Sequence, residues 1–169
     1  RAVLTSTLAP SGKDRQCSTR VPTVVDAGAL SILPELLTED LECTPLHVLT
    51  PHAGEAAALL IALEDTGTPA QETRRWSRER VEAHPGLAAR EICRRTGSTV
   101  LLKGATTLIA APQRPLVSVD GGPGWMASAG SGDVLAGILG AVLAGAAARW
   151  EQGAPDASGA DPVLRSEEH

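Results

Sequence analysis

The sequence predicts an α/β fold in which a mostly parallel sheet is covered by helices, and three observations lead to this class. In the first two thirds, short β-branched apolar runs alternate with segments of helical periodicity, the order typical of parallel strands joined by helices. In the last third, three strand-like runs follow one another through brief turns, which is typical of hairpins. A glycine-rich turn then leads into a long apolar segment, the pattern of a helix that begins at a ligand-binding loop.

The first half of the chain contains two predicted strand–helix units. Residues 21–26 form a β-branched apolar run that suits a buried parallel strand, and a helical segment follows over 29–37, where Pro34 is expected to introduce a kink. Residues 47–50 predict a second strand that ends at a proline, and residues 55–63 carry apolar side chains at helical spacing. Two such units in succession favour a parallel sheet.

Another helix and three strands are predicted in the second half. Residues 64–80 are polar and then strongly charged, and their mixed signs favour a solvated loop or helix face over an RNA-binding or membrane-binding patch. A helix is expected from Pro85 to about residue 95, because proline suits a first helical turn and Gly97 suits a helix end. Three short strands follow, at residues 99–103, 107–111 and 116–119.

The longest apolar stretch, residues 134–148, predicts a helix that starts at Asp133. Its valine, leucine and isoleucine side chains form a stripe, and no charge interrupts it before Arg149, so we expect a central, buried helix. The stretch is shorter than the roughly 20 residues that a bilayer-spanning helix needs, so no membrane association is expected.

Residues 1–150 are expected to form one domain, because a chain of 169 residues can enclose a single hydrophobic core. Residues 1–20 show no clear period and predict a loop or the end of a region that has been cut away. Residues 151–169 are rich in Gly, Pro, Asp, Ser and Glu, so they predict a polar, flexible tail.

The composition excludes several functional classes. The 15 basic residues are outnumbered by 20 acidic ones, which argues against a nucleic-acid-binding protein. Phe and Tyr are absent, so stacking of bases on aromatic side chains is not expected to hold a nucleotide. The three cysteines are widely spaced and outside any CxxC pattern, and the start of the chain has no long apolar run. We therefore expect neither a disulfide framework nor a zinc site. We also expect the protein to be soluble and cytoplasmic.

The turn Gly130–Asp133 is the strongest candidate for a ligand-binding element. Two glycines let the backbone approach a ligand closely, and the helix that follows directs its unpaired N–H groups and the positive end of its dipole at the turn. Such a place suits phosphate, which a carboxylate would repel. Asp133 is therefore expected to be a base that faces a hydroxyl, although Asp is also favoured as a helix-capping residue.

Three further segments precede this turn in a fixed order: Val24–Leu30, Leu49–Glu55 and Val100–Thr107. Together with the glycine-rich turn they resemble the ADP/ATP-dependent NAD(P)H-hydrate dehydratases, repair enzymes with a ribokinase-like fold, over about residues 21–148. The resemblance implies a three-layer sandwich and suggests a homotetramer. Asp26 matches an Asp of the family, whereas Gly28 stands where the family pattern has a second Asp.

The resemblance also implies roles for individual residues. His52 and Asp133 match residues that contact the hydrated nicotinamide nucleotide, and Asp133 is the implied catalytic base. In the glycine-rich turn, Gly132 matches a residue that contacts the adenosine nucleotide, and Gly130 and Ser131 are expected to contribute beside it. The same nucleotide-binding role is implied for the strand-end segment Lys103, Gly104, Ala105, Thr106 and Thr107. Mg²⁺ is expected to bridge the donor phosphates, without dedicated metal ligands in the chain.

The implied activity is ADP- or ATP-dependent dehydration of hydrated NADH or NADPH, which restores the reduced nicotinamide. Two alternatives remain open: a vitamin or sugar kinase of the same fold, and an inactive nucleotide-binding fragment. The second alternative arises because the family begins with a further strand–helix region and a glycine-containing loop, neither of which is recognisable in residues 1–20. The choice between ADP and ATP also stays open.

Overall fold

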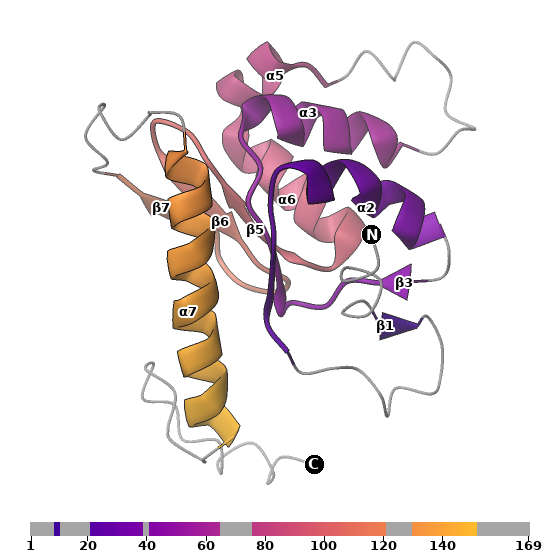
Figure 1. Cartoon of the computed structure of the whole chain (residues 1–169). Coiled ribbons are helices and arrows are strands. Elements are labelled where there is room, and N and C mark those ends of the chain that lie inside the picture. Colours follow the sequence, from indigo (N-terminus) through magenta and orange to yellow (C-terminus); the bar gives the residue numbers. More distant parts are fainter. Residues whose placement is uncertain (1–8, 11–20, 39–40, 65–75, 121–129, 152–169) are drawn as a thin grey trace, which may run out of the picture.

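A five-stranded sheet organises the chain, and its strands lie in the order β2-β4-β5-β6-β7 (Figure 1). The structure is a computed structural model that describes residues 9–10, 21–38, 41–64, 76–120 and 130–151. The strands of this sheet are β2 (Thr23–Val25), β4 (His47–Leu49), β5 (Thr99–Leu102), β6 (Thr107–Ala110) and β7 (Val117–Val119). All five lie within predicted strands.

The sheet is mixed, with a parallel half and an antiparallel half. β2 pairs in parallel with β4, and β4 in parallel with β5. β5, β6 and β7 then pair in antiparallel fashion through short connections, which confirms the predicted hairpins. The parallel half places the carboxyl ends of three strands along one edge of the sheet.

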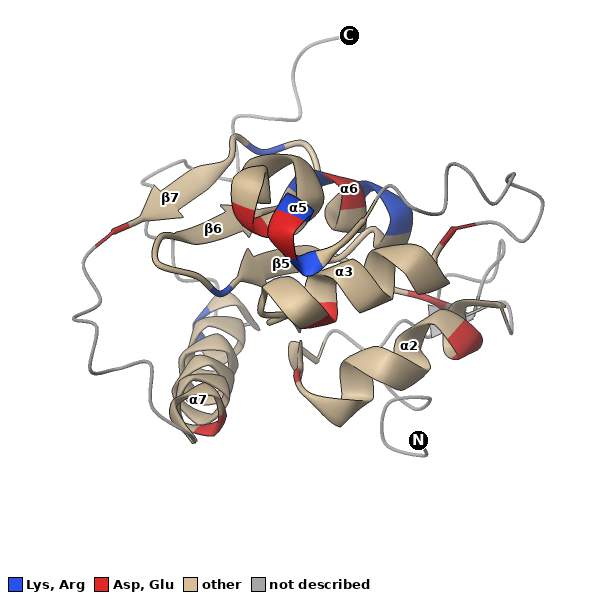
Figure 2. Cartoon of the chain, turned by 90° about the horizontal axis from the view of Figure 1, so that it is seen from above, with Lys and Arg blue, Asp and Glu red and all other residues tan. Residues whose placement is uncertain are grey.

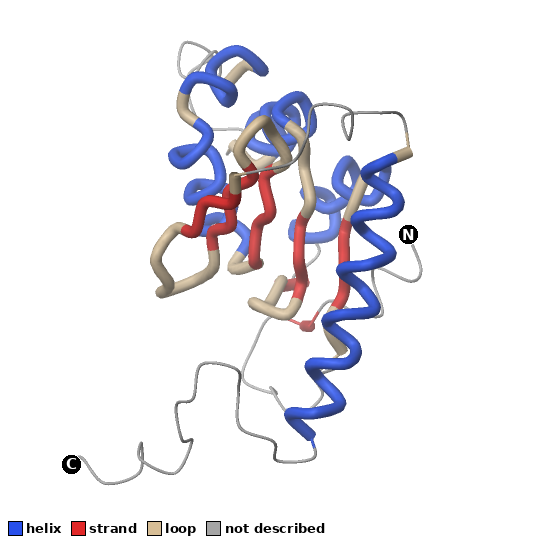
Figure 3. The backbone as a smooth tube through the Cα atoms, turned by 90° about the vertical axis from the view of Figure 1, so that its left-hand side faces the viewer, coloured by secondary structure: helices blue, strands red, loops and turns tan. Residues whose placement is uncertain are grey.

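Four helices cover one side of this sheet, while a fifth lies on the opposite side (Figures 2 and 3). The four are α2 (Gly28–Thr38), α3 (Ala53–Ala62), α5 (Arg78–Ala83) and α6 (Pro85–Thr96), and the fifth is α7 (Ser131–Glu151). α6 begins at the expected proline and ends at Gly97, whose φ of 73° is a left-handed conformation that glycine adopts at little cost. Pro34 lies inside α2, as predicted.

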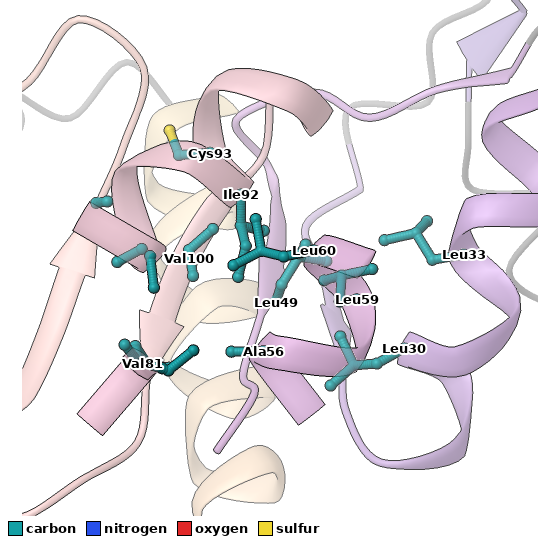
Figure 4. Packing of buried hydrophobic residues seen from close by; sticks show 14 of the residues in the cluster. Leu30, Leu33, Leu49, Ala56, Leu59, Leu60, Val81, Ile92, Cys93 and Val100 are labelled. Atoms are coloured by element: carbon teal, nitrogen blue, oxygen red, sulfur yellow. The ribbon is translucent and has the colours of Figure 1, made fainter. Parts of the chain in front are cut away.

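The hydrophobic core lies between the sheet and these four helices. Its largest fully buried members include Leu36 of α2. Leu33 of α2, Leu60 of α3 and Ile92 of α6 belong to the same cluster (Figure 4). Alternate strand residues such as Leu49 join this cluster, because successive side chains in a strand point to opposite faces.

Within the predicted solvated stretch at 64–80, residues 77–80 are exposed as expected, and Trp76 is the exception. Trp76 is buried in the core cluster, and the Arg80 guanidinium lies 5.8 Å from the centre of its ring. Ser77 begins α5 by accepting a hydrogen bond from the Arg80 backbone N–H. The sequence did not predict the burial of Trp76, because the residues that follow it are mostly charged and lie on the solvent side of α5.

A small second sheet was not predicted. β1 (Ala9–Pro10) pairs antiparallel with β3 (Leu41–Glu42), and each strand has two residues, too few to produce an alternating pattern. Cys43, just after β3, and Cys93 on α6 are buried free thiols, and burial raises the pKa of Cys43 to about 12.

The expectation of a central, buried helix at 134–148 is wrong. α7 packs against β2, and none of its residues from Ser131 to Trp150 is buried. Val134, Ile138 and Val142 are each more than half exposed. The absence of charge correctly indicated an apolar surface, but the described part of the chain covers only the side of α7 that faces the sheet. By length and composition alone, Ser131–Trp150 could cross a bilayer.

Because α7 packs on one side only, substitutions at the adjacent residues Ile138 and Leu139 are expected to change the free energy of unfolding by different amounts. Ile138→Glu is expected to change the free energy of unfolding by less than about 0.5 kcal/mol, because its side chain is exposed. Leu139→Glu is expected to destabilise by about 2 kcal/mol, because this half-buried side chain would bring a carboxylate towards the sheet. Urea unfolding measures both, and equal losses would contradict the described packing.

A second stability prediction concerns Glu91 on α6. Its carboxylate accepts hydrogen bonds from Arg94 and Arg95 at 2.7 Å, and Arg95 also donates to the Leu63 carbonyl after α3. The Arg94 hydrogen bond first, and Arg95 after it, lower the pKa of Glu91 from 4.5 to about 2. A lowered pKa stabilises the fold above pH 4.5, and the contribution disappears as the pH falls towards 2.

Glu91→Gln is therefore expected to lower the free energy of unfolding by about 1 kcal/mol at pH 7 and by less at pH 3. Urea unfolding at the two pH values measures the difference. Glu82→Gln is the control, because the Arg78–Glu82 pair is more exposed and should matter less. A Glu91 effect that stays constant with pH would contradict the assigned ion pairs.

Candidate active site

Three strand ends and the start of one helix meet at the carboxyl edge of the parallel strands. Asp26 follows β2, His52 follows β4 and Lys103 follows β5. The β4–β5 pairing extends into these connections, because the Lys103 N–H donates to the Pro51 carbonyl at 2.8 Å and residues 52 and 103 form a parallel bridge. α7 begins at the same edge (Figure 1). In open α/β sheets this edge is where ligands bind.

An ion pair between Asp26 and Lys103 lies at the centre of this cluster. Lys103 Nζ is 2.9 Å from Asp26 Oδ1, and both side chains are largely shielded, with exposed fractions of 22% and 14%. Burial alone would raise the pKa of Asp26, but hydrogen bonds from Lys103 and Thr50, together with the Lys103 charge, hold that pKa below its ordinary value. Asp26 is therefore an anion at neutral pH, and Lys103 is its counterion.

A second carboxylate, Glu55, connects Lys103 to His52. Glu55 Oε2 lies 3.9 Å from Lys103 Nζ and accepts the His52 backbone N–H at 2.9 Å. The Glu55 backbone N–H donates in return to His52 Nδ1 at 3.1 Å. These reciprocal bonds form a capping box that begins α3, with His52 as the capping residue. The signal for this cap in the sequence is a Glu three positions after the His.

The first turn of α7 lies directly against the ion pair. A Cβ atom added to Gly132 would be 3.5 Å from Lys103 Nζ and 3.8 Å from Asp26 Oδ2. Gly130 precedes the helix with a φ of 85°, a conformation that suits glycine. The helix starts at Ser131, two residues earlier than predicted, so Asp133 lies within the first turn instead of at its start. The unpaired N–H groups of α7 thus lie beside an ammonium, an arrangement suited to anions.

The turn after Lys103 is exposed and tightly bent. Residues 104–106 are exposed between β5 and β6. A Cβ on Gly104 would lie 3.3 Å from the Thr106 carbonyl oxygen, so the close approach favours glycine. The Thr106 hydroxyl donates to Asp120 Oδ1 at 2.5 Å, which ties this turn to the end of β7. Ala105 and Thr107 lie in the same segment, and Thr107 begins β6.

The structure thus brings Lys103, His52 and Gly132 to the same edge of the sheet. Asp133 is exposed in the first turn of α7, and no bond from it to this cluster is found among the described residues. Asp26 was noted only as a match to a family pattern, and its ion pair was missed. Residues 121–129, most of residues 1–20 and the tail from residue 152 lie outside the described residues.

The described residues contain no group of three His, Cys, Asp or Glu side chains that could hold a metal ion. Asp26 and Glu55 are both oxygen donors of the kind that Mg²⁺ prefers, and both lie at Lys103. Mg²⁺ commonly uses only one or two carboxylates together with substrate phosphates. The donor set therefore fits a phosphate-bound ion but provides no complete protein cage.

Fold and site together define an α/β protein of the ribokinase-like class, with a candidate anion site at the carboxyl edge of its sheet. The sequence profile of the NAD(P)H-hydrate dehydratases matches residues 13–159. The chain belongs to the NAD(P)H-hydrate dehydratase family.

Individual relatives agree with this assignment. The ADP-dependent (S)-NAD(P)H-hydrate dehydratase of Neisseria meningitidis is 41% identical over 126 residues, which cover 73% of this chain and 38% of the relative. The bifunctional NAD(P)H-hydrate repair enzyme of Mycobacterium tuberculosis is 40% identical over 129 residues, covering 75% and 23%. The solved ADP/ATP-dependent NAD(P)H-hydrate dehydratase of Bacillus subtilis, co-crystallised with ATP/Mg²⁺, is 27% identical with a TM-score of 0.52, covering 72% and 38%. The chain thus spans less than two fifths of the length of each of these relatives.

Proposed function

We propose that this chain provides the nucleotide-binding and catalytic part of an ADP- or ATP-dependent NAD(P)H-hydrate dehydratase. The observation that carries the proposal is the convergence of Lys103, His52 and the first turn of α7 at one edge of the sheet. The printed activities of the relatives support the choice of reaction.

The phosphate-binding half of the proposed site consists of Gly130, Ser131 and Gly132 with the segment 103–107. The first turn of α7 offers free N–H groups, and Lys103 offers a positive charge near Gly132. A bound polyphosphate would compete with Asp26 and Glu55 for the Lys103 ammonium. Lys103 is therefore expected to exchange part of its carboxylate contacts for phosphate oxygens.

The substrate half of the proposed site consists of His52 and Asp133. Asp133 follows Gly132 in the first turn of α7 and is exposed, so its carboxylate is open to a substrate hydroxyl. In the proposed reaction, Asp133 accepts the proton of the ring hydroxyl while that oxygen bonds to the terminal phosphorus of ATP or ADP, and the bond to the bridging oxygen breaks. The lone pair of the nitrogen in the hydrated (tetrahydropyridine) ring then expels the phosphate, and loss of a proton from the neighbouring ring carbon restores the dihydropyridine of NAD(P)H. The protein contributes positioning and electrostatic stabilisation.

Mg²⁺ has a defined place in this proposal. Asp26 and Glu55 share the Lys103 ammonium, and Asp133 adds a third carboxylate in the first turn of α7, so additional positive charge would favour binding of a polyphosphate. A bound Mg²⁺ would neutralise phosphate charge, and Glu55 or Asp26 would hold it together with the phosphates.

Membership of the NAD(P)H-hydrate dehydratase family supports a cytoplasmic location for this chain. The family resemblance also suggests a homotetramer, and light scattering tests that oligomeric state.

The deciding experiment follows absorbance at the reduced-nicotinamide band after the chain is mixed with hydrated NADH, Mg²⁺ and either ADP or ATP. A nucleotide-dependent rise is expected, and the nucleotide that produces it identifies the donor. Phosphorylated product without recovery of absorbance would favour the kinase alternative. Nucleotide binding without any turnover would favour the nucleotide-binding fragment.

A further inference from the structure

The two ring nitrogens of His52 have different partners, which determines where its proton lies. Nδ1 lies 3.1 Å from the Glu55 backbone nitrogen, which always carries a hydrogen. Nδ1 must therefore present its lone pair to accept this bond. Because a neutral imidazole carries one N–H, the hydrogen is on Nε2, and His52 is held in the Nε2–H tautomer.

The Nε2–H group is available to a ligand. The His52 side chain is 60% exposed, and Nε2 lies 3.6 Å from Glu55 Oε2, which is too far for a hydrogen bond. No hydrogen bond of Nε2 is found within the described ranges. The parallel bridge to Lys103 keeps the ring at the same strand edge as the ammonium.

Gly54 determines the position of the ring. A Cβ atom at residue 54 would lie 3.1 Å from His52 Cε1 and 3.4 Å from Nδ1. The ring thus lies against the first turn of α3, in space that a larger residue would take. Any side chain at position 54 would push the ring by a few tenths of an ångström.

We propose that His52 acts as a hydrogen-bond donor, through Nε2–H, to an oxygen acceptor of the bound nicotinamide nucleotide, and that Gly54 and Glu55 are its positioning residues. The proposal deepens the proposed function, on which its ligand assignment rests. Since the lone pair of Nδ1 is used by the cap, His52 is no proton acceptor for the substrate hydroxyl. That role is left to Asp133.

Nuclear magnetic resonance of the uniformly ¹⁵N-labelled chain tests the tautomer directly. A long-range ¹H–¹⁵N correlation spectrum reports the protonation of each imidazole nitrogen, and comparison with His52→Gln identifies the His52 signals. The expected result at pH 7.5 is an unprotonated Nδ1 and a protonated Nε2 without ligand. A protonated Nδ1, in a neutral or a charged ring, would overturn the proposal without affecting the proposed function.

Ligand titrations test the donor role with the same spectrum. NADH is expected to shift the His52 Nε2 signal, while nicotinamide riboside and inorganic phosphate distinguish a carboxamide acceptor from a phosphate acceptor. NADH binding that leaves Nε2 unmoved would overturn the donor role. Failure of NADH and nucleotide to bind at all would overturn the proposed function. The spectrum without ligand would still show whether Nδ1 accepts the hydrogen bond from the Glu55 backbone.

Two variants separate positioning from folding. Gly54→Ala removes no hydrogen-bonding group but displaces the His52 ring, so NADH affinity is expected to fall by about tenfold, the loss of roughly one hydrogen bond. Gly137→Ala on α7 is the matched control, because a Cβ there meets nothing within 4 Å, and it should leave affinity unchanged. Equal affinity in both variants would exclude Gly54 as a positioning residue.

Discussion

Replacement of Asp133 by asparagine is expected to lower the rate of NADH recovery from hydrated NADH by about 10²- to 10⁴-fold, the usual contribution of a general base. The side chain keeps its size and its place in the first turn of α7, but it no longer accepts the proton of the ring hydroxyl. Affinity for ADP and ATP is expected to stay the same or to rise slightly, because a negative charge beside the phosphates is removed. Absorbance assays and calorimetric titrations measure the two quantities separately.

Glu82→Gln is the matched control, because Glu82 is an exposed carboxylate on α5 that pairs with Arg78. Its activity should equal that of the unchanged chain. Full activity in Asp133→Asn would contradict the assignment of Asp133 as the base. The carboxylate would then act only on the dipole of α7, as many acidic residues in first turns do.

Lys103→Met is expected to have the second largest effect, on nucleotide affinity and on stability together. Loss of the ammonium removes a charged hydrogen bond to phosphate, so affinity for ADP or ATP should fall by about 10- to 100-fold. It also leaves Asp26 largely shielded and without its counterion, which is expected to cost about 1–3 kcal/mol of unfolding free energy.

The double variant Lys103→Met with Asp26→Asn separates these two effects. Removing the Asp26 charge eliminates the unpaired anion, so most of the stability should return while nucleotide affinity remains low. Urea unfolding and nucleotide titration of the single and double variants form a complete cycle. Recovery of affinity in the double variant would show that Lys103 acts on the fold instead of on the ligand.

The elements that could be predicted from the sequence are those with strong local signals. The β-branched run before Asp26 and the proline and glycine at the ends of α6 each determine local conformation with little help from the rest of the chain. The hairpins were predictable for the same reason. By contrast, β1 and β3 have two residues each and carry no pattern that a sequence can reveal.

The environment of α7 could not be predicted, because an uncharged helix shows only that its surface is apolar. Whether that surface is covered depends on which other segments lie beside it, and the described residues place β2 on one side alone. The candidate site was partly predictable from the family pattern. The contact between Asp26 and Lys103 was not, because it depends on the order of the strands and joins residues 77 positions apart.

That separation also determines when the site can form as the chain folds. The hairpins β5–β6–β7 close short loops, whereas the Asp26–Lys103 contact must wait until the parallel strands between them have assembled. Nucleotide binding is therefore expected to lag behind the recovery of secondary structure during refolding. Since a late contact is absent from the transition state, ATP should slow unfolding while leaving the refolding rate nearly unchanged.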